Sequence, residues 1–296
     1  MPLLAASREC SKTGVMSILQ VPHSRPSAIL FDWHATLVDT HSAMYSAVDD
    51  MLAQLDQLEL TPRLMRPEDS KTPEDARLLS YVREHKRLHP KVVAQKKISR
   101  TDIFELLFGE DDQAKADAHQ AFDDAYQQHI EDVYPLEKDI RQQVERLKEV
   151  GLPIGVISNR RRDFFEQELA QVDGTGWEDL FDVSVCGTDV SARKPSAEPL
   201  LHALTRLSVP ADEHVWYVGD STTDVIAARR AGITPIFYNG AGWPQSWIDR
   251  IFPGSLRHPH RPEAVVGTIS EVTELARWML AQDLRVQRAR AKTDHA

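Results

Sequence analysis

Four polar residues stand where the chain passes from a structured run into a turn, and together they could handle an anionic group. Asp32, Ser158 and Asp220 each end a short apolar run that predicts a buried strand. Lys194 precedes a proline at the start of a predicted helix, where a loop can carry its ammonium to the same place. Parallel strands end at a common edge of a sheet, where ligands bind. We therefore expect these four side chains to share one site.

The expected site has enough negative charge to hold a hard divalent cation. Mg²⁺ prefers oxygen ligands, keeps several waters and accepts phosphate oxygens. Asp224 adds a third carboxylate, although an acidic residue in the first turn of a helix also serves to complement the helix dipole. Ser158 is likewise a residue type that caps helices. The sequence predicts a Mg²⁺ site, with these structural alternatives open for Asp224 and Ser158.

The elements that would position these residues alternate between strand and helix after residue 135. Strands separated by helical patterns of this length imply βαβ units. We therefore predict an α/β fold with a doubly wound, Rossmann-like parallel sheet. Its predicted strands are 28–31, 154–157, 181–186, 214–218 and 233–238, and its predicted helices are 138–150, 164–171, 195–207, 223–231 and 271–281.

A purely helical segment interrupts this sheet after its first strand. Residues 41–135 show apolar positions at helical spacing and no strand pattern, which predicts four helices forming an inserted cap domain. The first of these helices is expected to continue to about residue 61. The expected division is a flexible leader at 1–26, a core domain at 27–40 and 136–284, the helical cap domain at 41–135, and a flexible, frayed tail at 285–296.

Composition argues against several classes of protein but allows a local basic pocket. The chain has 296 residues, with 45 acidic against 35 basic side chains and a formal charge of −10, which argues against a nucleic-acid or anionic-membrane binder. Two cysteines make no disulfide framework and fit a reducing cytoplasm. Residues 1–26 lack a sustained apolar run, so we expect neither a signal peptide nor a membrane span there.

Four short motifs, taken in order, resemble those of the haloacid dehalogenase superfamily over residues 27–240. The predicted cap is similar to that of the family's phosphoglycolate phosphatase and β-phosphoglucomutase branch. The motifs are Asp32-Trp33-His34-Ala35-Thr36-Leu37-Val38-Asp39, Val156-Ile157-Ser158-Asn159, Arg193-Lys194-Pro195 and Gly219-Asp220-Ser221-Thr222-Thr223-Asp224.

The resemblance implies phosphate hydrolysis in two steps. Asp32 would attack phosphorus and form an aspartyl-phosphate that water then hydrolyses. By the same likeness, Mg²⁺ would bind the Asp32 carboxylate, the backbone carbonyl of His34, Asp220 and Asp224, the last directly or through water. The ion would shield the repulsion between the carboxylate and the phosphate.

The resemblance also assigns the residues that would hold the substrate. Ser158 and the backbone N–H of Asn159 would bind phosphate oxygens, and Lys194 would support the developing charge and position Asp32. The implied substrate is a small phosphorylated metabolite, contacted in part by the cap, and neither the metabolite nor the oligomeric state follows from the sequence.

His34 departs from the family pattern, which has a second Asp two residues after the nucleophile. An imidazole with a pKa near 6.5 can act as general acid and base, or the residue is a spacer. A phosphonoacetaldehyde hydrolase-like reaction, with Lys71 of the cap as the amine, and a catalytically silent binding protein remain alternatives. The dehalogenase branch fits poorly because it works without metal.

Three further groups have no assigned role. Arg160, Arg161 and Arg162 are interpreted as surface residues that could also attract an anion. Trp243 and Trp247 pack a long loop or recognise a partner. The His258-Pro259-His260 segment has short ligand spacing, but it lies in a Pro-rich loop with no nearby Cys or third His, which argues against a zinc site.

Overall fold

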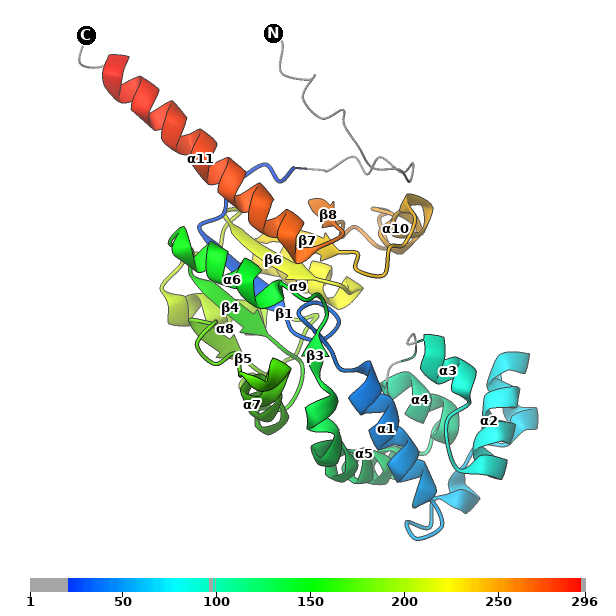
Figure 1. The fold of residues 1–296 in the computed structure, drawn as a ribbon. Coiled ribbons are helices and arrows are strands. Elements are labelled where there is room, and N and C mark those ends of the chain that lie inside the picture. Colours follow the sequence, from blue (N-terminus) through cyan, green and yellow to red (C-terminus); the bar gives the residue numbers. More distant parts are fainter. Residues whose placement is uncertain (1–20, 96–97, 99, 294–296) are drawn as a thin grey trace, which may run out of the picture.

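Strand β1 (Ala28–Asp32) lies in the middle of a six-stranded parallel sheet in the computed structural model, which describes residues 21–95, 98 and 100–293. The chain forms an α/β core with a helical unit beside it (Figure 1). The strand order β5-β4-β1-β6-β7-β8 confirms the predicted doubly wound fold class. The other strands are β4 (Ile154–Ile157), β5 (Val183–Val185), β6 (Val215–Gly219), β7 (Thr234–Tyr238) and β8 (Ala264–Val266).

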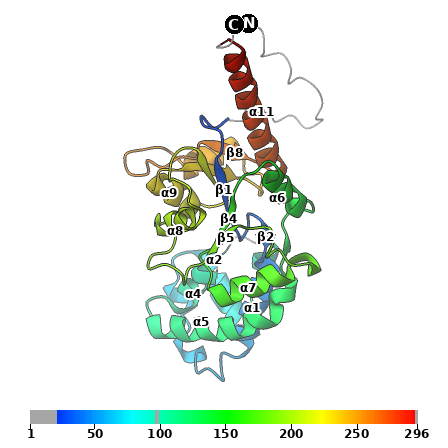
Figure 2. The same ribbon diagram turned by 90° about the vertical axis from the view of Figure 1, so that its left-hand side faces the viewer.

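Both faces of β1 are covered, which explains its unbroken apolar sequence. Ala28 and Leu30 pack into the cluster formed with α8 (Glu198–Leu207) and α9 (Thr222–Ala231). The alternate residues, Ile29 and Phe31, pack into the other cluster. That side carries α6 (Ile140–Glu149), α7 (Arg162–Gln171) and α11 (Ile269–Thr293), so helices lie on both faces of the sheet (Figure 2).

The helical unit, residues 41–135 and hereafter the cap, lies beyond the edge at which β1 ends (Figures 1 and 2). Its two connections to the core pair as the short antiparallel strands β2 (Val38–Asp39) and β3 (Tyr134–Pro135). Its helices are α1 (His41–Ala53), α2 (Pro73–His85), α3 (Pro90–Gln95), α4 (Arg100–Phe108) and α5 (Asp112–Tyr126), with 3₁₀ turns at Thr61–Arg63, Pro67–Asp69 and Gln127–Asp132.

Several boundaries differ from the expected ones. The first cap helix ends at Ala53, and its expected continuation to about residue 61 is a turn that leads into the 3₁₀ turn Thr61–Arg63. Helix α10 (Gln245–Ile251), α3 and β8 were not expected, because each is short and bounded by prolines or turns. A further 3₁₀ turn, Val172–Gly174, follows α7.

The two chain ends also differ from expectation. Helix α11 extends to Thr293, past the helix expected at 271–281, through strong helix formers such as Arg, Ala, Gln and Lys. The expected fraying of the tail from residue 285 stays a prediction. Most of the expected leader, residues 1–20, and residues 294–296 lie outside the described residues. Ser24 lies against β6, where its carbonyl accepts a hydrogen bond from Trp216 Nε1 at 3.0 Å. Across the described ranges, no helix has the length and apolar character to cross a membrane.

Candidate active site

Three carboxylates meet at the edge where β1 and β6 end. Oxygens of Asp32, Asp220 and Asp224 all lie within 4.8 Å of one another. The sheet register explains this, because Asp32 is opposite Ile157 on β4 while Phe31 is opposite Val218 on β6. Ser158 and Asp220 therefore follow their strands at the same edge as Asp32, as the apolar runs predict.

Lys194 reaches the carboxylates from the loop between β5 and α8. Its buried Nζ donates to Asp32 Oδ1 at 2.5 Å, to Asp224 Oδ1 at 2.7 Å and to the Tyr217 hydroxyl at 2.8 Å. Burial alone would lower the pKa of this ammonium, but the pairing with Asp224 and Asp32 raises it. Lys194 therefore keeps its charge and fixes one oxygen of Asp32.

Asp224 uses both of its oxygens in hydrogen bonds. Oδ1 accepts from Lys194 and from the Tyr217 hydroxyl at 2.9 Å, and Oδ2 accepts from the backbone N–H of Ser221 at 3.1 Å and its hydroxyl at 2.5 Å. Ser221 and Asp224 form a capping box at the start of α9. A carboxylate has about four lone-pair positions, and four donors occupy them. Asp224 thus anchors Lys194 and the start of α9. This role resembles the alternative left open for it, that of an acidic residue in the first turn of a helix.

The negative charge of the site exceeds what Lys194 neutralises. Burial raises the pKa of Asp32 to about 7, with Asp224 adding to the rise and Lys194 opposing it. Burial and the neighbouring carboxylates also raise the pKa of Asp220 well above its usual value. Three carboxylates face one ammonium, so a divalent cation would offset the excess charge. The all-oxygen donor set suits Mg²⁺.

Asn159 holds Lys194 in place through its side chain. Asn159 Nδ2 donates to the Lys194 carbonyl at 3.0 Å, and the Lys194 N–H donates to Asn159 Oδ1 at 2.9 Å. The preceding Ser158 is buried, and its hydroxyl accepts from the Arg160 N–H at 3.2 Å. The loop after β4 is therefore tied both to the lysine loop and to itself.

His34 is hydrogen-bonded at both ring nitrogens. Arg160 Nε donates to His34 Nε2 at 3.0 Å, so the proton is assigned to Nδ1, which lies 2.9 Å from the Thr40 hydroxyl. Burial and the nearby Arg160 guanidinium lower the pKa of His34 well below its usual value. The imidazole is therefore neutral, and its acceptor nitrogen is engaged.

A buried acidic residue, Glu168 of α7, completes this arrangement. Its carboxylate is 0% exposed and accepts from Trp33 Nε1 at 2.8 Å and from the Tyr126 hydroxyl at 2.7 Å. Arg160 Nε lies 3.0 Å from Glu168 Oε1, and its guanidinium stacks over the Tyr126 ring at 4.2 Å. Tyr126 belongs to the cap, so these contacts join the cap to the core.

Sequence reasoning missed Glu168 and Tyr217, and it placed Arg160 on the surface. The last interpretation is wrong, since the Arg160 side chain is only 13% exposed. One signal was present: Glu168 falls on the apolar stripe of α7 with Phe164, Phe165 and Leu169. An acidic residue on a buried helix face requires a partner.

Other residues singled out in the sequence lie elsewhere. Arg161 pairs with Asp163 at 2.6 Å and Arg162 pairs with Asp189, so neither belongs to the carboxylate cluster. Lys71 is exposed on the loop before α2.

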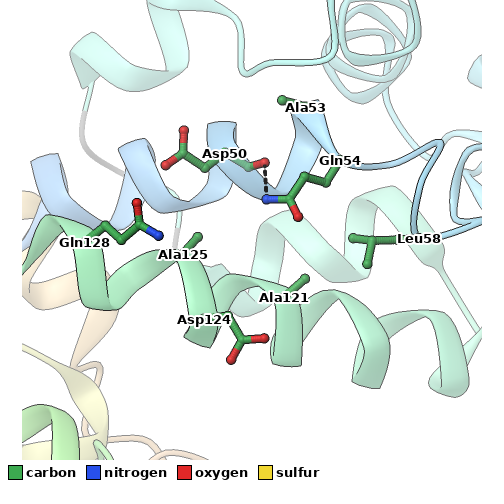
Figure 3. A pocket seen from close by; sticks show the side chains of 8 residues that line it. All are labelled: Asp50, Ala53, Gln54, Leu58, Ala121, Asp124, Ala125 and Gln128. Carbon is green, nitrogen blue, oxygen red and sulfur yellow. Dashed lines mark hydrogen bonds between the residues drawn. The ribbon is translucent and has the colours of Figure 1, made fainter.

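A cavity of about 460 Å³ lies in the cap between α1 and α5 (Figure 3). Asp50 and Asp124 contribute carboxylates to its lining, and Gln54 donates to the Asp50 carbonyl at 3.2 Å. Alanine and glutamine side chains form much of the remaining wall. A lining without a cation is unsuited to a phosphate, and none of the carboxylate-cluster residues contributes to it.

A family comparison decides what kind of protein carries this site. The model of the haloacid dehalogenase-like hydrolases matches residues 29–237, from β1 to β7. The chain belongs to this family. A haloacid dehalogenase-like hydrolase from Bacteroides fragilis shares its fold, with a TM-score of 0.57 at 20% identity, covering 84% of this chain and 100% of that one.

Two curated relatives of this haloacid dehalogenase-like hydrolase carry the same name. A phosphoglycolate phosphatase of Yersinia pestis is 34% identical over 120 residues, which are 40% of this chain and 50% of the relative. The chain thus spans about half the length of that protein. A phosphoglycolate phosphatase of Xanthomonas campestris is 28% identical over 229 residues, covering 75% of this chain and 89% of the relative.

Proposed function

We propose that this haloacid dehalogenase-like hydrolase is a Mg²⁺-dependent phosphatase that acts on a small phosphorylated metabolite. The observation that carries the proposal is the convergence of Asp32, Asp220 and Asp224, two of which, Asp32 and Asp224, pair with the Lys194 ammonium. In this proposal, these residues would supply a nucleophile, a cation-binding set and a fixed positive charge at one sheet edge.

Asp32 is the proposed nucleophile, and Lys194 is its orienting group. Because Lys194 holds Oδ1, the carboxylate has one fixed orientation when a phosphate approaches. The Asp32 oxygen would form a bond to phosphorus while the ester oxygen leaves, and water would then hydrolyse the aspartyl-phosphate. The Lys194 charge also stabilises negative charge that develops on the transferring group.

Mg²⁺ is the proposed cofactor, held by the Asp32 and Asp220 carboxylates and the backbone carbonyl of His34. When bound, it would neutralise the phosphate and align it for in-line attack. Asp224 would act on the ion indirectly, because its oxygens are engaged by Lys194, Tyr217 and Ser221.

Ser158 and Asn159 are the proposed phosphate-binding residues. The Ser158 hydroxyl oxygen accepts a hydrogen bond from the Arg160 N–H, so its own O–H can still donate to a phosphate oxygen. The Asn159 side chain is committed to Lys194, which leaves its backbone N–H for a phosphate oxygen.

The hydrogen bonds of His34 support the spacer role over general acid and base catalysis. Its Nε2 would first have to leave Arg160 before it could exchange a proton with substrate. We therefore expect the His34→Ala substitution to slow the hydrolysis of an alkyl phosphate and that of p-nitrophenyl phosphate to similar extents. A loss at least about 100-fold larger for the alkyl ester, which needs a proton on its leaving oxygen, would restore the acid/base role.

Phosphate release from a metabolite panel with and without Mg²⁺ tests the proposal. Phosphoglycolate is the first compound to include, because two relatives bear the name of its phosphatase. The Asp32→Asn variant must lose the activity, while Asp179→Asn, at a side chain that is 72% exposed, must retain it. Metal-dependent release that survives Asp32→Asn would refute the nucleophile. No release of phosphate from any compound would favour the silent binding protein.

A further inference from the structure

A second cavity, of about 550 Å³, lies on the core between α9 and the segment 250–260, which comprises the end of α10 and the loop after it. This size falls in the range of small-molecule sites. No Asp or Glu lines it. Its lining includes three arginines and two histidines, namely Arg230, Arg250, Arg257, His258 and His260. In a chain whose formal charge is −10, this concentration of basic side chains is unusual.

The three arginines have no carboxylate partner within the described part of the chain. Arg230 donates to the Pro195 carbonyl at 2.9 Å, and Arg250 lies over the Trp247 ring at 5.8 Å. Arg257 has no hydrogen bond or ion pair to any described residue. By contrast, the adjacent Arg229 pairs with Glu263 at 3.0 Å. The like charges around the cavity therefore remain uncompensated, and an anion would relieve their repulsion.

The wall of the cavity is held in place by bonds that do not involve its charges. Arg229 Nε donates to the Arg261 carbonyl at 2.8 Å, and Arg261 Nη2 donates to the Pro253 carbonyl at 2.6 Å. Phe252 is buried and meets Phe237 of β7 edge to face, with ring centroids 5.0 Å apart. The loop that carries Arg257 is thus fixed to α9 and to the sheet before any ligand arrives.

Apart from Thr222, the remaining lining is apolar and offers a surface for an organic group. Ile226 of α9, Ile251 and Phe252 contribute to it, together with two prolines of the loop. From the cations and this apolar wall we infer that the cavity binds a small organic phosphate, with its phosphates on the arginines and its less polar part against Phe252 and Ile226. Guanidinium groups suit phosphate because they donate in a planar fork.

The proposed site is distinct from the carboxylate cluster but uses the same helix. Asp224 lies on the buried side of α9, whereas Ile226 and Arg230 lie on its outer side and line the cavity. Net charge also separates the two sites: one gathers carboxylates and the other gathers guanidinium groups. A cation therefore fits the first, and an anion fits the second.

Calorimetric titration with ADP tests the inference in the full chain carrying Asp32→Asn, which prevents turnover. We expect saturable binding of one ADP that weakens at least about tenfold in the added Arg250→Gln/Arg257→Gln variant, since two charged donors are lost. The matched control is Arg66→Gln/Arg77→Gln, which removes two exposed arginines of the cap and should leave ADP affinity unchanged.

Two results would overturn the assignment. One is the absence of saturable ADP binding up to millimolar concentration, and the other is equal affinity with and without Arg250 and Arg257. Inorganic pyrophosphate, titrated in parallel, should bind more weakly than ADP, because it has no organic group to contact the apolar wall. Equal affinities would show that the apolar wall does not contribute to binding. Arg257→Gln alone serves if the double variant unfolds, because Arg257 has no partner to lose within the described residues.

Discussion

Replacing Glu168 with glutamine should destabilise the protein more than any surface change. The substitution keeps the size of the side chain but removes the charge that balances the Arg160 guanidinium, which is only 13% exposed. In the native protein, burial lowers the pKa of Arg160 and the pairing with Glu168 opposes that effect. The guanidinium stays charged in the variant as well, because the ordinary pKa of arginine lies far above neutral pH. An uncompensated buried charge then remains beside His34.

The magnitude follows from the kind of pair that is broken. Removing one partner of a buried ion pair costs about 3–5 kcal/mol. In the native protein, Trp33 Nε1 and the Tyr126 hydroxyl donate to different oxygens of the Glu168 carboxylate. The glutamine amide has only one oxygen, so one of these two donors loses its acceptor. For a chain of this size, 1 kcal/mol shifts Tm by about 2–4 °C, so we expect a fall of at least about 6 °C.

Thermal unfolding followed by tryptophan fluorescence measures this effect. The matched control is Glu166→Gln on the same helix, whose 61% exposed carboxylate pairs with Arg162 at 3.3 Å and should contribute under about 1 kcal/mol. A second comparison uses Arg160→Met with Glu168→Leu, because losing both charges leaves none unpaired. A Glu168→Gln melting curve that coincides with the Glu166→Gln curve would refute the account of a buried, paired charge.

Three further outcomes follow from the site. Tyr217→Phe removes a hydroxyl that contacts both Lys194 and Asp224, so kcat should fall about tenfold with little change in KM, as steady-state kinetics would show. Ser221→Ala removes the capping box of α9 and should cost about 1 kcal/mol of stability, measurable by urea unfolding. The pKa of Asp32 is about 7 in the metal-free protein, so Mg²⁺ binding at pH 7 should release about half a proton or more and weaken as the pH falls. Calorimetry in buffers of different ionisation enthalpy would count these protons, and a release of none would contradict the raised pKa.

The sheet and the edge that carries Asp32, Ser158 and Asp220 could be predicted because they depend on local patterns. Each strand is a short apolar run, and the parallel arrangement places every strand end on one side. The register of β1 against β4 and β6 then sets the three residues side by side.

The partners of the polar side chains could not be predicted in the same way. Tyr217 stands inside the apolar strand β6 and has the pattern of a core residue, yet its hydroxyl contacts Lys194 and Asp224. Tyr126 and Glu168 are 42 positions apart in different units of the chain. No spacing rule connects residues whose contact depends on how the cap lies on the core.

The last residue of β1 and the two that follow it show why these unpredicted contacts matter to the proposed chemistry. Asp32 is bound by Lys194 from the loop after β5, Trp33 by Glu168 of α7, and His34 by Arg160 from the loop after β4. Three consecutive side chains are thus tied to three different segments, which leaves the backbone at Asp32 little freedom. If Asp32 is the nucleophile, as proposed, it would lose little further entropy on reaching a phosphate, because the cost of positioning it was met on folding. Since Tyr126 also binds Glu168, the packing of the cap on the core and the placement of the proposed nucleophile depend on the same buried carboxylate.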